Sequence, residues 1–293
     1  MQATSIAPRR ASRIAIGALL TLAIAVALAP ERAQAQGYTF TTFNVPGAEL
    51  TQPHGLNAAG QIVGGYSVDR TAGYGFIDNA GTFTTLSAPG AANTTLEGIN
   101  ASGTIVGVYD YRDYYTEHAF VYSGGTFTTL GVPGAAIAAA LGINDAGQIV
   151  GSYVTTTGQG YGFLDVGGVF TTIAAPGARS TVATGINAAG QVVGYYSDAM
   201  GTHGFLDNAG AFTTLNVPGA APDVQAEGIN DAGQIVGTYT GAADFNEHGF
   251  VYSAGTFTTF DAPGASNTFL SGVNTAGQLV GFDNPNDGSP QQG

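Results

Sequence analysis

A repeat of about 43 residues constrains the fold of this chain more than any other feature. The dipeptide Pro-Gly recurs six times, with its proline at positions 46, 89, 133, 176, 218 and 263. A Gly-x-Asn triplet also recurs six times, with its asparagine at positions 57, 100, 144, 187, 230 and 274. Consecutive asparagines are 43 or 44 residues apart, so two independent markers keep one period. The chain therefore consists of six tandem copies of one unit.

Each copy contains four short segments that are typical of β-strands. In the third copy, residues 127–130 alternate large apolar residues with Thr, which is the period of a half-buried strand. The segment that ends at Ile143 and residues 148–153 are apolar or β-branched, and a short hairpin loop ending at Gly147 joins them. A fourth strand begins at Tyr161. Four short strands and their turns account for the length of the unit.

This content matches one blade of a β-propeller, whereas the rungs of a solenoid are usually about 20–30 residues long. A single copy has too few large apolar side chains to offset the entropy lost on ordering its backbone. Neighbouring copies must therefore cover each other's faces. We predict an all-β fold, a six-bladed β-propeller of six four-stranded repeats over residues 36–283. A β-solenoid and another β arrangement are the alternatives.

Two registers of the blade are compatible with the sequence. The Gly-Phe strand occurs only five times, once as Ala-Phe, with its aromatic residue at Phe76, Phe120, Phe163, Phe205 and Phe250. If each blade starts with Phe-Thr-Thr, the sixth blade lacks its outer strand. If each blade starts with Gly-x-Asn, the first Phe-Thr-Thr, at residues 40–43, closes the last blade. The Gly of the repeated Ile-Val-Gly indicates close backbone approach near a crowded axis, which favours the second register.

The N-terminus has the pattern of a cleaved export signal. Arg9, Arg10 and Arg13 form a basic region, residues 14–28 are apolar, and Ala33-Gln34-Ala35 is a small-x-small cleavage site. The apolar run is short for a membrane span, which needs about 20 residues. A twin-arginine signal is the alternative, although the residues after the Arg pair fit that motif poorly. We predict a signal peptide over residues 1–35 and a polar tail over residues 284–293.

The composition limits the partners of the exported chain. Cleavage after Ala35 would remove four of seven arginines and one of twenty acidic residues, which takes the formal charge from −13 to −16. Such a protein repels nucleic acid and anionic lipid, so we expect neither as a partner. The absence of cysteine excludes disulfides and thiolate metal sites, so packing alone must stabilise the fold.

Several residues resemble the HAF family of probable extracellular repeats, which is named for a His-Ala-Phe triplet. His118-Ala119-Phe120 matches the triplet, and His203 and His248 each begin a His-Gly-Phe variant. The first and third copies depart from it, with Tyr74 and Tyr161 in place of His. The resemblance covers about residues 38–283. It implies an exported β-repeat protein, and it implies no activity, substrate or catalytic residue.

Three groups of polar residues have both a structural and a functional interpretation. The triplet histidines could converge as ligands or bases, but the replacement of His by Tyr in two copies favours a packing role. The Gly-x-Asn asparagines are predicted to form turns, and a ring of six amides around a channel is the alternative. His54 precedes the first of these triplets, where no other copy has His, and this makes it a candidate binding residue.

The loops between the Ile-Val-Gly strand and the Gly-Phe strand vary most, and repeat proteins often bind ligands on such a face. The fifth-copy loop contains Asp244 and Glu247. Aromatic rings beside acids suit sugar binding, a carboxylate pair suits glycoside hydrolysis, and a solvated polar loop is the remaining interpretation. The richest loop belongs to the second copy, and its candidate residues are Asp110, Tyr111, Arg112, Asp113, Tyr114, Tyr115 and Glu117.

No motif indicates a catalytic residue, a metal site or a cofactor. The sequence has no nucleophile elbow, no phosphate loop and no His-Glu-x-x-His. Residues 283–288 resemble the start of a calcium loop, but Pro285 stands where a ligand is needed. We therefore expect none of the three.

The near-identical copies lack the asymmetric polar cluster that a catalytic site needs. We therefore predict an exported, non-catalytic binding or interaction propeller. We expect a monomer that is secreted, periplasmic or at the cell surface, with a glycan or protein as its extracellular ligand. One alternative is a hydrolase or lyase acting on extracellular polysaccharide, with Asp110, Asp113 and Glu117 as its first candidate residues. The other is a structural surface or matrix protein.

Overall fold

Twenty-two β-strands and no helix make up the part of the chain that the structure describes. The computed structural model describes residues 38–69, 72–111, 117–285 and 293, which belong to one compact unit, Ala33–Gly293. The predicted signal peptide lies outside these residues, as does the predicted tail apart from residues 284, 285 and 293. Within the described ranges, no helix has the length and apolar character needed to cross a membrane.

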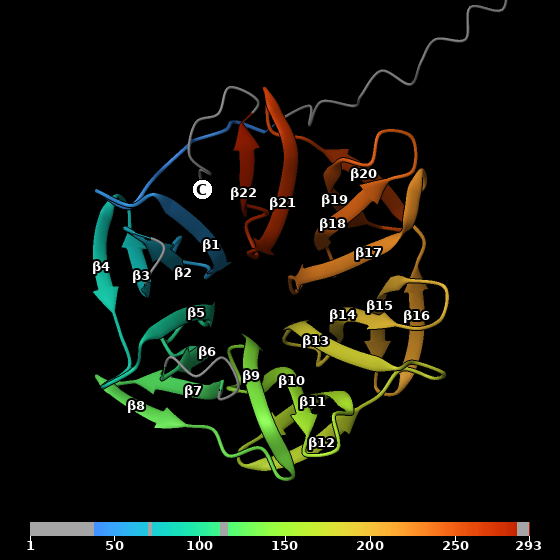
Figure 1. Ribbon diagram of the computed structural model, residues 1–293. Coiled ribbons are helices and arrows are strands. Elements are labelled where there is room, and N and C mark those ends of the chain that lie inside the picture. Colours follow the sequence, from blue (N-terminus) through green and yellow to red (C-terminus); the bar gives the residue numbers. More distant parts are fainter. Residues whose placement is uncertain (1–37, 70–71, 112–116, 286–292) are drawn as a thin grey trace, which may run out of the picture. The chain divides into compact units, whose positions relative to one another are not determined.

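The strands form six consecutive antiparallel blades (Figure 1), and a single parallel bridge between Thr202 and Asp223 joins the fourth blade to the fifth. Blade 1 contains β1 (Leu50–Leu56), β2 (Ile62–Ser67), β3 (Gly73–Asn79) and β4 (Thr82–Leu86). Blade 2 contains β5 (Asn93–Ile99), β6 (Ile105–Asp110), β7 (His118–Ser123) and β8 (Thr126–Thr129). Blade 3 contains β9 (Ala135–Ile143), β10 (Ile149–Thr155), β11 (Gly160–Val166) and β12 (Val169–Ile173). Blade 4 contains β13 (Ser180–Ile186), β14 (Val192–Ser197), β15 (Thr202–Asn208) and β16 (Ala211–Leu215). Blade 5 contains β17 (Ala220–Ile229), β18 (Ile235–Gly241), β19 (Glu247–Ser253) and β20 (Thr256–Phe260). The described part of blade 6 contains β21 (Ala265–Val273) and β22 (Leu279–Pro285).

The first strands of the six blades pack side by side in a closed ring. β1 contacts β5, and the contacts continue through β9, β13 and β17 to β21, which contacts β1 again. In Figure 1 these strands surround the centre of the blades, and the Phe-Thr-Thr strands lie at the rim. The prediction of an all-β six-bladed propeller is therefore confirmed, and the solenoid alternative is wrong because its repeats would stack without closing.

The asparagine of each Gly-x-Asn triplet closes this ring with hydrogen bonds. The Oδ1 atom of Asn144 accepts from the backbone N–H groups of Ala146 and Gln148, which shapes the hairpin as predicted. Its Nδ2 atom donates to the carbonyl oxygen of Asn187 in the next blade, at 3.0 Å. The same inter-blade bond recurs from Asn57, Asn100, Asn187, Asn230 and Asn274, the last of which returns to Asn57. The asparagines are thus both turn formers and a ring of six amides.

Two repeated glycines are required because backbone approaches them closely. A Cβ on Gly142, in the Gly-x-Asn triplet, would lie 2.6 Å from the carbonyl oxygen of Thr184 in the next blade. A Cβ on Gly151, in Ile-Val-Gly, would meet the carbonyl oxygen of Ala139 at a β-bulge within its own blade. The close approach predicted for the Gly of Ile-Val-Gly is therefore present at Gly151, but it comes from the bulge rather than from crowding at the axis. The close approach at Gly142 was not predicted.

The core lies between adjacent blades, as the repeat argument requires. Five fully buried phenylalanines come from the Gly-Phe strands: Phe76, Phe120, Phe163, Phe205 and Phe250. One cluster joins Val63 of blade 1 to Leu96 and Phe120 of blade 2. Burying such a side chain stabilises the fold by about 1.5–3 kcal/mol, and each blade obtains this only from its neighbour.

Blades 1 to 5 have the second of the two predicted registers. Each begins with the strand that ends in Gly-x-Asn and finishes with the Phe-Thr-Thr strand. In blade 6 the described part contains two strands, β21 and β22. The backbone N–H of Phe43, in the first Phe-Thr-Thr segment, donates to the carbonyl oxygen of Gly293 at 3.1 Å. Leu130 donates to Ala119 at the corresponding place in blade 2.

Candidate functional site

The histidines of the His-Ala-Phe and His-Gly-Phe triplets serve packing, as predicted. The ring of His118 lies 5.1 Å from the ring of Tyr109, centroid to centroid, on the adjacent strand. Tyr74 and Tyr161 take the same place in blades 1 and 3, at 5.5 and 5.7 Å from their partner tyrosines. Because Tyr and His both supply an aromatic ring there, the position requires a ring rather than an imidazole.

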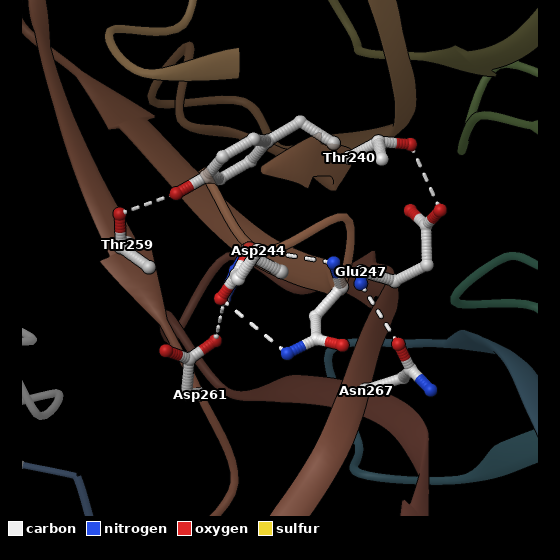
Figure 2. A network of polar contacts seen from close by, with 9 residues as sticks. Thr240, Asp244, Glu247, Thr259, Asp261 and Asn267 are labelled. Atoms are coloured by element: carbon white, nitrogen blue, oxygen red, sulfur yellow. Dashed lines mark hydrogen bonds and ion pairs between the residues drawn. The ribbon is translucent and has the colours of Figure 1, made fainter. Parts of the chain in front are cut away.

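The acids of the fifth-copy loop stabilise the loop itself (Figure 2). The imidazole of His248 lies between two carboxylates, with Nδ1 2.8 Å from Asp261 and Nε2 3.2 Å from Asp244. Figure 2 shows that Glu247 accepts a hydrogen bond from the Thr240 hydroxyl and that its backbone N–H donates to Asn267. Burial alone would lower the pKa of His248, but hydrogen bonds and charge from both aspartates raise it. Asp244 and Glu247 are therefore structural groups in this fold.

The second-copy loop is described only at its ends, because Arg112, Asp113, Tyr114 and Tyr115 lie outside the described residues. Asp110 accepts from the amide of Asn93 with both carboxylate oxygens, at 3.0 Å each. Tyr111 is 51% exposed, and its ring meets that of Tyr109 edge-on at 5.4 Å. Glu117, at the far end of the loop, lines a pocket that extends towards the first strands of the blades.

This pocket has a volume of about 420 Å³ and is built by blades 1, 2 and 3. Alternate residues of three first strands face it, because successive side chains of a strand point to opposite sides. The lining includes Leu50, Gln52 and His54 from β1, Thr95 and Glu97 from β5, and Ala139 and Leu141 from β9. Tyr66, Tyr74 and Glu117 complete the polar wall. The fold therefore brings two predicted residues, His54 and Glu117, into one pocket, whose lining contains neither Asp244 nor Glu247.

His54 and Glu97 belong to a set of equivalent positions that differ between blades. Each residue of this axial set stands immediately before the glycine of Gly-x-Asn: His54, Glu97, Leu141, Thr184, Glu227 and Ser271. Leu141 is apolar, and the hydroxyls of Thr184 and Ser271 donate to backbone carbonyl oxygens of neighbouring blades, at 2.7 and 2.6 Å. The three ionisable members come from blades 1, 2 and 5.

The imidazole of His54 is held by Glu97 across the boundary between blades 1 and 2. Nδ1 lies 2.6 Å from Glu97 Oε2, and the two side chains are 27% and 17% exposed. Because a carboxylate only accepts, Nδ1 carries the hydrogen, and Nε2 has no hydrogen-bond partner among the described residues. Burial lowers the pKa of His54, but the charge and hydrogen bond of Glu97, with the charge of Glu227, outweigh it and raise the pKa overall.

Glu227 faces the same centre from blade 5, on the other side of the ring from Glu97. Burial, followed by repulsion from Glu97, raises its pKa to about 8, and His54 opposes this only in part. The pKa of Tyr195, on β14, rises to about 12 through burial and the charges of Glu227 and Glu97. At neutral pH, Glu227 therefore holds its proton and can donate a hydrogen bond.

Two observations describe the charged groups that the centre offers. No group of three or more His, Cys, Asp or Glu side chains in the described ranges has the arrangement that holds a metal ion. The chain has no lysine, and Arg179 is the one arginine within the described residues. The described part of the pocket lining contains no arginine.

Glu97 and Glu227 could have been found in the sequence because their position differs from copy to copy. The residues around the axial set repeat closely, while the residue before each glycine changes from His to Glu, Leu, Thr, Glu and Ser. We predicted His54 from its uniqueness alone and missed that its five equivalents share one ring. The statement that the copies lack an asymmetric polar cluster is therefore wrong for the axial set.

No known protein-family model matches this chain, and no curated protein matches it. Among solved structures, it is similar to AofleA from Arthrobotrys oligospora, at 12% identity over 76% of each chain, with a TM-score of 0.51. A fucose-specific lectin from Aleuria aurantia is 12% identical over 71% of this chain and 77% of the lectin, with a TM-score of 0.46. A putative gluconolactonase is 13% identical over 84% of this chain and 88% of its own, with a TM-score of 0.48. At these identities the likeness to AofleA concerns the fold alone.

Proposed function

We propose that this propeller binds a neutral saccharide in the pocket formed by blades 1, 2 and 3. The observation that supports this most is the convergence of His54, Glu97 and Glu117 with the phenol rings of Tyr66 and Tyr74 around about 420 Å³. Pockets for small ligands usually measure about 300–1,000 Å³ and combine a few polar groups with apolar or aromatic walls.

The chemistry of the lining favours hydroxylated ligands. Carboxylates accept hydrogen bonds from sugar hydroxyls, and an amide such as Gln52 both donates and accepts. Leu50, Leu141 and the tyrosine rings offer apolar surface to the C–H faces of a sugar. Within the described lining, a phosphate, sulfate or uronate would meet the carboxylates of Glu97 and Glu117 and no arginine, and burying an unpaired charge is costly.

The biological setting of this proposal comes from the sequence. An export signal would place the protein in the periplasm, at the cell surface or in the medium, where glycans are abundant ligands. The formal charge of −13 for the whole chain disfavours nucleic acid and anionic membranes as partners. We propose that it acts as a monomer, and that it belongs with the exported repeat proteins that it resembles.

A glycan array followed by titration calorimetry tests the proposal. The mature protein is expected to bind neutral oligosaccharides and to ignore their uronic-acid and sulfated counterparts. Glu97→Gln keeps the shape of the side chain but weakens its acceptor, so we expect affinity to fall at least about tenfold, because a charge-assisted hydrogen bond contributes about 1.5–3 kcal/mol. Tyr111→Ala, in the exposed second-copy loop, is the control and should bind as the wild type does.

Two outcomes would contradict the proposal. If Tyr111→Ala loses affinity while Glu97→Gln keeps it, the variable loops carry the binding and the pocket does not. If the array is silent and the protein assembles at high concentration, the structural surface or matrix protein is the better interpretation. The thermal unfolding midpoint of each variant should stay within a few degrees of the wild-type value. A loss of affinity is then not caused by a loss of folded protein.

A further inference from the structure

The residue that follows the glycine of Ile-Val-Gly, or of its Val-Val-Gly and Leu-Val-Gly variants, differs in size around the ring. It pairs with the residue two positions before the axial set, as Gly65 pairs with Gln52. The six residues at this position are Gly65, Val108, Ser152, Tyr195, Thr238 and Phe282. Blade 1 is therefore the blade without a side chain there, and Gly65 lines the pocket.

A side chain at position 65 would enter the boundary between blades 1 and 2. A Cβ on Gly65 would lie 3.3 Å from Cγ2 of Thr95, on the first strand of blade 2, and Thr95 also lines the pocket. Ser67 and Gly73, which pair with each other, line the pocket from the same face of blade 1. Three lining positions of this face thus carry a hydrogen atom or a hydroxymethyl group, which leaves room for a ligand beside them.

Blade 6 shows what larger side chains do at the equivalent place. Phe282 pairs with Phe269 across the two strands, and their rings stack at 4.7 Å with an interplanar angle of 18°. The corresponding pair in blade 3 is Ser152 and Ala139, and Ala139 lines the pocket. The pocket therefore lies among blades that carry no aromatic ring at these two positions.

The spaces between blades 1, 2 and 3 close directly beyond His54 and Glu97. A Cβ on Gly55, the residue after His54, would lie 2.7 Å from the carbonyl oxygen of Glu97. A Cβ on Gly98, the residue after Glu97, would lie 3.2 Å from the carbonyl oxygen of Leu141. The ring of asparagine amides follows these contacts. A ligand between these blades therefore reaches a blind end at His54 and Glu97.

The pocket extends along β1 from this blind end to Leu50. Leu50 and His54 are four residues apart, which corresponds to about 13 Å at a rise of about 3.3 Å per residue. Ser67 pairs with Leu50 and marks the other end of the lining. This length exceeds one pyranose ring, so a ring at His54 leaves room for part of the sugar residue linked to it.

We infer that the pocket selects the terminal residue of a neutral saccharide, which enters end-on over the bare backbone of Gly65 until its hydroxyls meet His54 and Glu97. This deepens the proposed function and rests on it. A sugar residue inside a chain is linked on two sides, so it does not fit a blind end. Gly65 is a specificity-determining residue, because a side chain there would take space from the sugar ring.

Titration calorimetry with linear malto-, cello-, xylo- and manno-oligosaccharides of one to six sugar residues tests the end-on mode. For the series that binds, the affinity of the wild type should stop rising at about three sugar residues, because further residues lie outside the pocket. Affinity that rises with every added sugar residue up to six would show that the protein binds the interior of the chain.

Gly65→Val tests the role of the missing side chain, since blade 2 has Val at the equivalent position. The backbone of Gly65 is not left-handed and Val suits a strand, so the variant should fold. Its affinity for the same oligosaccharides should fall at least about tenfold. Ser152→Val makes the matched change in blade 3, outside the described lining, and should stay within about threefold of the wild type.

Thermal unfolding midpoints of both variants should lie within a few degrees of the wild-type value. If Gly65→Val does not fold, Gly65→Ala replaces it, because its methyl group needs Thr95 to move by only a few tenths of an ångström. Gly65→Ala should also bind more weakly than the wild type, and unchanged affinity in this variant would equally overturn the role of Gly65.

The outcomes distinguish this inference from the proposed function. Binding by the folded Gly65 variant within about threefold of the wild type, or affinity that rises up to six sugar residues, overturns the inference and leaves the saccharide pocket intact. Absence of wild-type binding to all four series overturns both. A plateau at about three sugar residues, together with a loss of affinity in the Gly65 variant and none in Ser152→Val, supports both.

Discussion

At the scale of single residues, the repeat is maintained by positions where a neighbouring strand leaves no room. A Cβ added to Gly142 would lie 2.6 Å from a carbonyl oxygen of blade 4, and a Cβ on its equivalents would lie 2.7–3.4 Å from the corresponding oxygen of the next blade. Backbone cannot yield as a flexible side chain does, because the Asn ring fixes the strands on both sides. A repeated glycine of this kind therefore reports contact between blades.

Gly142→Ala should consequently destabilise the fold. We expect a loss of about 1–3 kcal/mol in the free energy of unfolding, as for other forced insertions into a packed interior. Gly131→Ala is the matched control, because its Cβ would meet nothing within 4 Å and its backbone is not left-handed. Urea denaturation of both variants measures the difference. Equal stability of the two would show that the blades are not in contact at Gly142.

The sequence predicted part of the candidate site at this scale. His54 stood out because no other copy has His there, and the structure places it in a pocket with Glu117. Glu97 and Glu227 escaped prediction because their importance depends on ring closure, which brings residues of blades 1, 2 and 5 to one centre. Asp244 and Glu247 looked like ligand groups because sequence cannot reveal that His248, Thr240 and Asn246 already engage them.

At the scale of elements, the strands followed from the sequence and the loops did not. The alternation of apolar residues with Thr predicted the Phe-Thr-Thr strands. In the structure, a Thr hydroxyl of such a strand forms a hydrogen bond with a Tyr of the same blade, as Thr172 does with Tyr153 at 3.0 Å. The variable loops have no periodicity to interpret. In blade 5, the loop is held by the bridge of His248 between Asp244 and Asp261, a contact that only the fold creates.

This bridge should make the stability of blade 5 depend on pH. The pKa of folded His248 lies above its ordinary value near 6.5, and Asp244, Asp261 and the tilted ring of Tyr239 are the groups that face it. A group whose pKa is higher in the folded state contributes its full stabilisation at pH values below its unfolded pKa. This stabilisation is lost as the pH rises through the folded pKa. The stabilisation by His248 should therefore decline from pH 6 upwards.

Comparison with His248→Tyr isolates this effect, since Tyr occupies the equivalent position in blades 1 and 3. The free energy of unfolding of the wild type minus that of the variant should shrink between pH 6 and pH 9, as followed by urea denaturation. His54 and Glu227 titrate in both proteins and cancel in the difference. A constant difference across this range would mean that the bridge does not depend on a protonated ring.

At the scale of the whole molecule, closure of the ring gives the protein its candidate site. The period of about 43 residues predicted the number of blades, and the need for neighbours to bury each other's apolar faces predicted that they form one body. What the sequence could not supply was which residues meet at the centre. Ser271 and Asn274 of blade 6 complete the circle with bonds to Pro53 and Asn57 of blade 1.

A crystal structure with a bound neutral oligosaccharide tests the central claim most directly. The ligand should lie against the first strands of blades 1 to 3, with a sugar oxygen within hydrogen-bond distance of His54 or Glu97 and a ring against Tyr66 or Tyr74. A sugar seated instead on the rim of the blades or on the loop around Tyr111, with the central pocket filled only by water, would contradict it.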